Sequence, residues 1–214
     1  MSDDTSPKHL IVLVADKNME LAVRGLLDRT GALALQMIEA DIYVHPLRDP
    51  GCLRRSPDFL RDFHKQYVHA LVMFDREGCG DRGVGRDELE LDVERRLSDA
   101  GWIGRAAAVV LEPELEAWVW SDSPEVDQVL GWVGVQPNLR SWLEDEGFVK
   151  PGEMKPVRPK EAVERALRRS RKRRSSSIYF ELARRVSVQR CTDPAFEKLK
   201  ATLQRWFPAS PAKA

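Results

Sequence analysis

The sequence predicts an α/β fold in which a mostly parallel sheet is flanked by helices. Short apolar runs that stop at turn residues are typical of buried parallel strands. Between these runs lie segments in which apolar residues recur every three to four positions, as in amphipathic helices. This alternation indicates βαβ units with right-handed crossovers. The chain has 214 residues, of which 43% are hydrophobic, so it is long enough for one sizeable core and a small appendage.

The first half of the chain contains all the expected strands. They are residues 9–14, a stretch within 34–44, residues 70–74 and residues 106–111. Helices are expected over residues 18–29, from Ser56-Pro57 onwards, over 87–99 and over 114–122. Gly31 follows the first helix, Ser56 and Pro57 provide a cap and a first helical position, and Gly101 ends the third. These elements predict an α/β core over residues 8–122.

The second half of the chain has a helical character. Prolines and glycines interrupt residues 124–158, which predicts short helices joined by loops. Longer helices are expected from Pro159 onwards, over 179–186 and over 193–206. We therefore expect a helical extension over 123–207, packed on the core, and a disordered tail over 208–214.

Charge and cysteine content limit the class of protein. Lysine plus arginine equals aspartate plus glutamate at 34 each, but acids dominate residues 75–146 and bases dominate 150–174. Three scattered cysteines argue against a disulfide framework or a zinc site and are typical of a reducing compartment. With no signal peptide and no apolar stretch of about 18 residues, the sequence predicts a cytoplasmic protein that does not enter a membrane.

Carboxylates follow two of the expected strands directly. Asp75 and Glu77 come after residues 70–74, and Glu112, Glu114 and Glu116 come after residues 106–111. Because ligands bind at the carboxyl ends of parallel strands, these acids are expected to lie close together. Gathered acids repel one another unless a cation neutralises them. The pattern therefore favours a divalent metal site.

Several short motifs resemble one family of proteins. Residues 115–122 read Leu-Glu-Ala-Trp-Val-Trp-Ser-Asp and are similar to an Ile-Glu-Ala-Trp-Leu-Leu-Ala-Asp motif of Toprim-like nucleases from prokaryotic phage-defence operons, including methylation-associated defence systems. These are distantly similar to overcoming-lysogenisation-defect nucleases. Residues 16–20, the Asp75-x-Glu77 pair and the Cys191–Phe196 stretch agree in order, so the resemblance covers roughly residues 9–206.

The resemblance implies a Toprim-like, Rossmann-like sheet and a metal-dependent nuclease of an antiviral system. The metal would be Mg²⁺ or Mn²⁺, which take oxygen ligands and activate water. The implied metal ligands are Asp16, Glu20, Asp75 and Glu77, and the implied catalytic residues are Asp75, Glu77, Glu20 and Glu116. The implied partners are nucleic acid, with DNA favoured, and other subunits of a defence system.

Two of these positions depart from the family pattern and favour an alternative function. Asp16 replaces the usual first glutamate, and Glu77 replaces the second aspartate of Asp-x-Asp. Each change keeps a carboxylate but alters its reach by one methylene. The alternative is a catalytically silent subunit that binds nucleic acid or a partner protein. A phosphatase or nucleotidyl-transfer reaction uses the same metal chemistry.

Each acid also has a structural interpretation. Asp75 could only begin a turn, Glu116 could form a structural ion pair, and Glu112 and Glu114 could only favour a helix N-terminus. Asp16 and Glu20 could be an exposed helix start, and Asp122 could cap the next turn.

Two further segments carry charge or glycine. A basic segment over residues 165–174 is expected to bind the nucleic-acid backbone. The alternatives are a solvated helix face that pairs with acids of this chain, or a surface that docks to an acidic partner. The basic segment comprises Arg165, Arg168, Arg169, Arg171, Lys172, Arg173 and Arg174. The loop 78–83 matches Gly-x-Gly-x-x-Gly, but it follows the third strand beside acids, so a flexible loop near a metal is favoured over a dinucleotide site.

Overall fold

A four-stranded, all-parallel sheet forms the centre of the computed structural model, which describes residues 6–209 except 82, 122, 151 and 154. The strand order is β2-β1-β3-β4. The strands are β1 (Lys8–Val14), β2 (Ala40–Val44), β3 (Tyr67–Asp75) and β4 (Ala106–Leu111). The two central strands, β1 and β3, are almost entirely apolar because both of their faces are covered. The predicted α/β class is confirmed.

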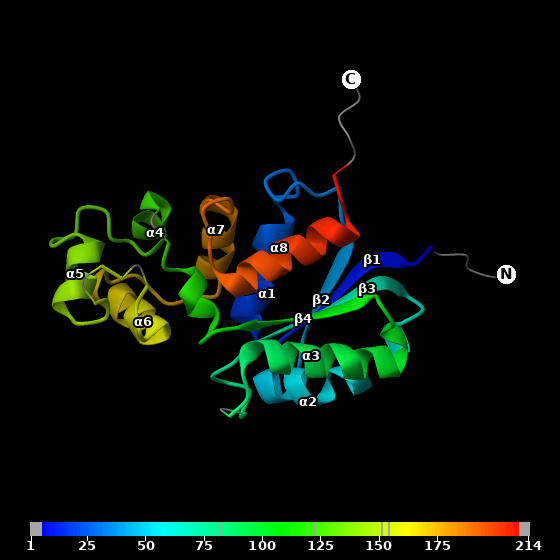
Figure 1. Ribbon diagram of the computed structural model, residues 1–214. Coiled ribbons are helices and arrows are strands. Elements are labelled where there is room, and N and C mark those ends of the chain that lie inside the picture. Colours follow the sequence, from blue (N-terminus) through cyan, green and yellow to red (C-terminus); the bar gives the residue numbers. More distant parts are fainter. Residues whose placement is uncertain (1–5, 82, 122, 151, 154, 210–214) are drawn as a thin grey trace, which may run out of the picture.

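Helices cover both faces of the sheet. On one face lie α2 (Arg48–Leu60) and α3 (Arg86–Leu97), and on the other lie α1 (Lys17–Leu27), α7 (Ser177–Arg185) and α8 (Pro194–Trp206) (Figure 1). The chain leaves β1 in one direction to form β2 and then returns past β1 to form β3. Right-handed crossovers therefore place α1 and α2 on opposite faces. The order of the strands reverses between β1 and β3, where ligands of open parallel sheets bind.

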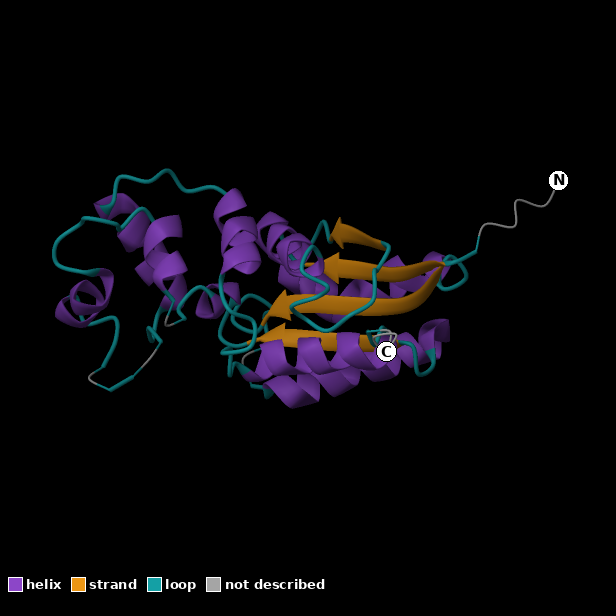
Figure 2. Ribbon diagram, turned by 90° about the horizontal axis from the view of Figure 1, so that it is seen from above, coloured by secondary structure: helices purple, strands orange, loops and turns teal. Residues whose placement is uncertain are grey.

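The helical extension expected over 123–207 divides in two. Helices α4 (Pro124–Val129), α5 (Leu139–Asp145) and α6 (Pro159–Arg169) lie beyond the carboxyl ends of the strands, whereas α7 and α8 pack on the core. In Figure 2 the strand arrowheads point toward the first of these two groups of helices. Pro208 pairs with Leu35 through an isolated bridge, while residues 210–214 of the expected tail lie outside the described residues. Within the described residues, no helix is both long and apolar enough to cross a membrane.

Two predicted helices differ in the structure. The helix expected from Ser56 begins eight residues earlier, at Arg48, and contains Pro57 in its interior. The helix continues through the proline because burial of Cys52, Leu53 and Leu60 stabilises the longer element. In place of the helix expected over 114–122 there is a short 3₁₀ helix at Leu115–Trp118, which we call the 3₁₀ turn.

The side chains around the 3₁₀ turn explain why it is short. Glu116 is buried, Trp118 donates to the Asp193 carboxylate at 3.0 Å, and Trp120 donates to the Pro159 carbonyl at 3.0 Å. These contacts point in different directions around the chain, whereas a surface helix buries only one stripe. Asp122, proposed as a cap, lies outside the described residues.

One edge of the sheet is closed by charged side chains. The outer side of β4 presents backbone N–H groups, and Glu90 and Glu94 of α3 accept from Val110 and Ala108 at 2.9 and 3.0 Å. The Lys198 ammonium of α8 contacts both carboxylates, at 3.1 and 2.8 Å. Covering these donors stabilises the edge and prevents pairing with another chain.

Helix α7 contacts α1 at a glycine. A Cβ atom on Gly25 would lie 2.7 Å from the Phe180 carbonyl oxygen and 2.9 Å from the Ala183 Cβ. We therefore expect Gly25→Ala to lower the free energy of unfolding by about 1–3 kcal/mol, although alanine is the better helix former. Chemical denaturation measures this change. Gly31→Ala is the control, because a Cβ there has nothing within 4 Å, and an equal loss in both variants would contradict the prediction.

Candidate functional site: a carboxylate groove at the strand ends

Asp75 connects three elements at the carboxyl end of β3. Its Oδ1 accepts a hydrogen bond from the Leu115 N–H at 2.9 Å, at the start of the 3₁₀ turn. Its backbone N–H donates to Oδ1 of Asp49 at 2.8 Å, in the first turn of α2. Asp75 is thus held by hydrogen bonds to the connections that follow β4 and β2. A residue that only begins a turn after β3 would not need these two contacts.

Asp49 is a site residue that the sequence analysis missed. It lies on the connection after β2, so all four strand ends contribute acids, whereas the sequence analysis considered those after three strands. Gly78, in the glycine-rich loop, lies against it: a Cβ on Gly78 would be 2.5 Å from the Asp49 Oδ2. Glycine at 78 therefore lets the loop approach a carboxylate. The sequence could have indicated Asp49, because this residue follows a strand. The predicted helix began only at Ser56, however, so Asp49 was assigned to a loop.

The carboxylates influence one another electrostatically. Burial raises the pKa of Asp75 well above its ordinary value, and the charges of Asp49, Glu116 and Asp16 raise it further. Burial also raises the pKa of Asp49, where the charge of Asp16 adds to the effect and that of Lys160 opposes it. The four acids therefore lie near one another, with Glu116 buried and the other three partly buried. We call Asp16, Asp49, Asp75 and Glu116 the acid cluster.

Two of the other three predicted metal ligands line a groove at the strand ends, and the third does not. Asp16 caps α1, where its Oδ1 accepts from the Met19 N–H at 2.9 Å, and it lines the groove described below. Glu77 is exposed and also lines the groove. Glu20 is buried on α1 between Lys17 and Arg24, with ion pairs of 2.8 and 2.9 Å. The structure therefore brings Asp16 and Glu77 to the groove but engages Glu20 elsewhere.

The acids after β4 have three separate environments. Glu116 is buried and its Oε1 accepts from the Tyr179 hydroxyl at 2.5 Å. Glu114 accepts from the Lys160 N–H at 2.9 Å, and burial followed by the charge of Glu116 raises its pKa. Glu112 is exposed and pairs with Arg76 at 3.3 Å. Glu114 directly precedes the 3₁₀ turn and makes no side-chain cap hydrogen bond there.

An open groove of about 720 Å³ lies at the strand ends, and three members of the acid cluster, Asp16, Asp49 and Asp75, line it, while Glu116 is buried behind them. Acids from the strand ends and bases from α2 and the start of α6 line the groove together. The lining residues are Asp16, Arg48, Asp49, Asp75, Arg76, Glu77, Gly78, Pro113, Glu114, Val157, Arg158, Pro159, Lys160 and Glu161. The exposed bases Arg48, Arg158 and Lys160 were not predicted, because they are scattered in the sequence. Only the fold brings them to one rim.

The predicted basic segment lies at the far end of α6 and in the loop after it. Arg165 pairs with Glu146 and Glu161 at 3.3 and 3.2 Å, and Arg174 pairs with Glu164. Within the described part of the chain, Arg168, Arg171 and Arg173 form no ion pair and are exposed. Arg165 contacts Glu161 of the groove lining, whereas Arg168 lies about 12 Å along α6 from Lys160 at a rise of about 1.5 Å per residue. Part of the segment is thus paired to acids, as one of the alternatives expects, and binding of nucleic acid by its exposed bases stays a prediction.

Two segments that carried the family resemblance contact each other. The Trp118 Nε1 donates to the Asp193 carboxylate at 3.0 Å, and the Trp118 and Phe196 rings meet edge to face at 5.5 Å. Asp193 also caps α8 and pairs with Lys155 at 2.6 Å. These residues stabilise the joint between the core and α8.

The chemistry of the acid cluster fits a hard divalent cation. All its side-chain donors are carboxylate oxygens, the ligands that Mg²⁺ and Mn²⁺ prefer, and their mutual repulsion is what a cation relieves. Across residues 6–209, apart from the four undescribed positions, no group of three or more His, Cys, Asp or Glu side chains is arranged to hold a metal ion. Metal binding here requires the carboxylates to rotate toward the ion.

The chain was compared with known proteins at three levels. No protein-family model matches it, and neither the curated proteins nor the solved structures contain a match.

Proposed function

We propose that the protein is a divalent-metal-dependent enzyme that hydrolyses phosphodiester bonds of nucleic acid, as a nuclease of an antiviral defence system. One observation carries the chemical part of the proposal: a single groove has clustered carboxylates at its base and three exposed bases at its rim. A metal–phosphate complex needs both kinds of group. The antiviral context is supported by the motif resemblance at residues 115–122.

In this proposal the residues of the groove have distinct roles. Asp75, Asp49 and Asp16 hold Mg²⁺ or Mn²⁺, with Glu77 as a further ligand from the exposed side. The metal supplies Lewis acidity and lowers the pKa of a bound water. Arg158 and Lys160 bind the phosphate oxygens from the rim. These bases lie at the start of α6, and the basic segment lies at its other end. A nucleic-acid strand bound in the groove can therefore extend along α6 to the basic segment.

The test is a cleavage assay with single- and double-stranded DNA and RNA, each with Mg²⁺, with Mn²⁺ and with chelator. We expect metal-dependent cleavage that falls at least about 100-fold in Asp75→Asn, the size of effect seen when one electrostatic group of an active site is removed. Glu88→Gln, an exposed change on α3, is the control. Cleavage that survives in Asp75→Asn, or no cleavage of any substrate, contradicts the proposal.

A silent binding subunit would give a different set of results. Nucleic acid would bind with an affinity that falls with salt, but calorimetry with Mg²⁺ would show no heat, and no substrate would be cut. The wild-type protein alone is sufficient to separate the two functions.

The exposed bases of the basic segment carry a prediction of their own. Replacing Arg168, Arg171 and Arg173 by glutamine is expected to weaken nucleic-acid binding equally for all sequences. The slope of log K against log salt should fall by about 2–3, since each phosphate contact contributes about 0.7–0.9. Fluorescence anisotropy at several salt concentrations measures this slope.

The matched control for this experiment removes the same charge from the α2–α3 layer. Arg55, Arg61 and Arg95 are exposed there. If the control triple variant lowers the slope as much as the first, binding depends on net charge and not on the basic segment.

A further inference from the structure

The buried carboxylate of the acid cluster is held by a distant residue. The hydroxyl of Tyr179, on α7, donates to Oε1 of Glu116 at 2.5 Å. Glu116 has an exposed fraction of 3% and Tyr179 of 4%. A buried carboxylate without a hydrogen-bond donor is costly, so this contact stabilises Glu116 where it lies.

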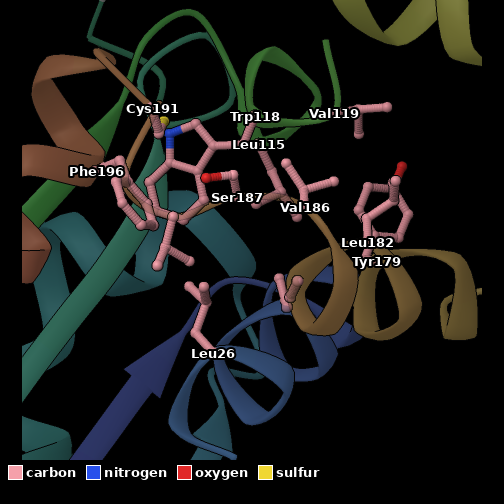
Figure 3. Close-up of a pocket in the computed structure, with 13 residues that line it drawn as sticks. Leu26, Leu115, Trp118, Val119, Tyr179, Leu182, Val186, Ser187, Cys191 and Phe196 are labelled. Carbon is pink, nitrogen blue, oxygen red and sulfur yellow. The ribbon is translucent and has the colours of Figure 1, made fainter. Parts of the chain in front are cut away.

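The surroundings of this hydrogen bond are apolar. Tyr179 and Leu182 of α7 line an apolar pocket together with Leu26 of α1 and with Leu115 and Trp118 of the 3₁₀ turn (Figure 3). A hydrogen bond in a region of low dielectric is stronger than the same bond in water. Burial, followed by the charge of Glu116, also raises the pKa of Tyr179, so the phenol keeps its proton and remains a donor.

Helix α7 is itself fixed against the elements of the groove. Besides the close contact at Gly25, the Ser176 hydroxyl donates to the side-chain oxygen of Asn18 at 2.7 Å. Asn18 lies in the first turn of α1, two residues after the cap Asp16. The start of α7 is therefore joined both to the helix that carries Asp16 and to the turn that carries Glu116.

We propose that Tyr179 is a positioning residue of the acid cluster. Its hydroxyl holds the carboxylate of Glu116, whose chain neighbour Leu115 donates its N–H to Asp75 at 2.9 Å, so that the cluster binds its divalent cation in a fixed geometry. The proposal rests on the proposed function, because it assigns a role within the same metal site. Tyr179 acts only through Glu116. One Glu116 oxygen accepts from the phenol, which leaves the other to accept from a water of the bound cation.

The test compares two tyrosine-to-phenylalanine variants of the full chain. Tyr179→Phe removes only the hydroxyl, and Tyr67→Phe is the matched control. The Tyr67 hydroxyl donates to the Asp41 carboxylate at the same distance of 2.5 Å, but Tyr67 begins β3 and lies at the amino end of the strands. Both variants lose one short hydrogen bond to a carboxylate. Thermal unfolding should show the larger loss of stability in Tyr179→Phe, because Glu116 is buried whereas Asp41 keeps the Lys8 ammonium at 2.8 Å.

Titration calorimetry with Mn²⁺ then separates positioning from stability. We expect Tyr179→Phe to weaken Mn²⁺ binding by about 10–100-fold, the usual effect of removing an outer partner of a metal ligand, and Tyr67→Phe to bind as the wild type. In cleavage assays the loss should fall on kcat and on the metal requirement, with KM for nucleic acid unchanged. Equal Mn²⁺ affinity of Tyr179→Phe and the wild type would overturn the positioning role.

A measurement without metal tests the positioning role separately from the proposed metal-dependent function. Wild-type protein that binds no Mn²⁺ overturns the metal site. Crystal structures of the metal-free wild type and Tyr179→Phe then decide the positioning role alone. A Glu116 carboxylate displaced in the variant supports it, and an unchanged Glu116 overturns it.

Discussion

Asp75→Asn is expected to make the metal-free protein more stable at neutral pH while removing its response to divalent metal. Burial and the neighbouring acids raise the pKa of Asp75 in the folded state above its value in the unfolded chain. The unfolded state therefore releases this proton at lower pH than the folded state. Stability falls as pH rises from about 4 through the folded pKa of Asp75, by about 1.4 kcal/mol for each pKa unit of difference.

Asparagine does not ionise, so the variant avoids the loss of stability that deprotonation of Asp75 causes, and it keeps the local structure. Its side-chain oxygen can still accept from the Leu115 N–H, which Asp75 contacts at 2.9 Å. The melting temperature of the variant should exceed that of the wild type at pH 7, by about 2–4 °C per kcal/mol for a chain of this size. The two proteins should converge near pH 4 and below, where Asp75 is protonated in both states.

Divalent metal should reverse the order of stability. At 100 times its Kd, Mn²⁺ stabilises a protein by about 2.7 kcal/mol, which corresponds to about 5–10 °C here. The wild type should show this rise, and Asp75→Asn should not. Asp58→Asn, the same change at an exposed position of α2, is the control. A variant that melts below the wild type at pH 7, or that responds equally to Mn²⁺, would contradict the assignment of Asp75.

The second large effect is expected at the edge of the sheet. Glu90 has an exposed fraction of 2%, accepts from the Val110 N–H at 2.9 Å and contacts Lys198 at 3.1 Å. Glu90→Ala leaves a buried N–H without its acceptor and removes one partner of the Lys198 ammonium. We expect a loss of about 1–3 kcal/mol, the cost of a buried donor without an acceptor, because Lys198 is partly exposed and keeps Glu94 at 2.8 Å. Urea denaturation measures it.

Two controls define this result. Glu88→Ala, two residues earlier on the exposed side of α3, should change stability by no more than about 0.5 kcal/mol. In a double-mutant cycle, Glu90→Ala and Lys198→Met should show a coupling of about 0.5–3 kcal/mol. If Glu90→Ala is as mild as Glu88→Ala, the carboxylate does not close the edge. Increased aggregation of Glu90→Ala would show that the uncovered strand accepts other chains.

The fold was predictable in class because its signals are local. Apolar runs such as residues 70–74 and 106–111 can be buried only as central or covered strands, and the turn residues between them mark the alternation with helices. The start of α2 was not predictable, because Pro57 is a strong local signal that burial of Cys52, Leu53 and Leu60 outweighs. The helix expected over 114–122 was wrong for a related reason: contacts on all sides of the chain limit it to the 3₁₀ turn.

The candidate site was predictable only in part. Asp75, Glu77 and Asp16 follow strands directly, so their position at the groove follows from the geometry of a parallel sheet. Asp49 depends on where α2 begins, and Tyr179 lies 63 residues from the Glu116 that it contacts. Neither contact has a local signature.

The sequence by itself determined an α/β chain with acids at the ends of parallel strands and with bases concentrated after them. Local patterns are sufficient for this, because burial and turn formation act over a few residues. Only the tertiary structure decided which acids share one poorly solvated cluster, which of them, like Glu20, are engaged in ion pairs, and which distant side chain holds Glu116. Charge interaction and hydrogen bonding depend on distance in space, and the fold alone sets those distances.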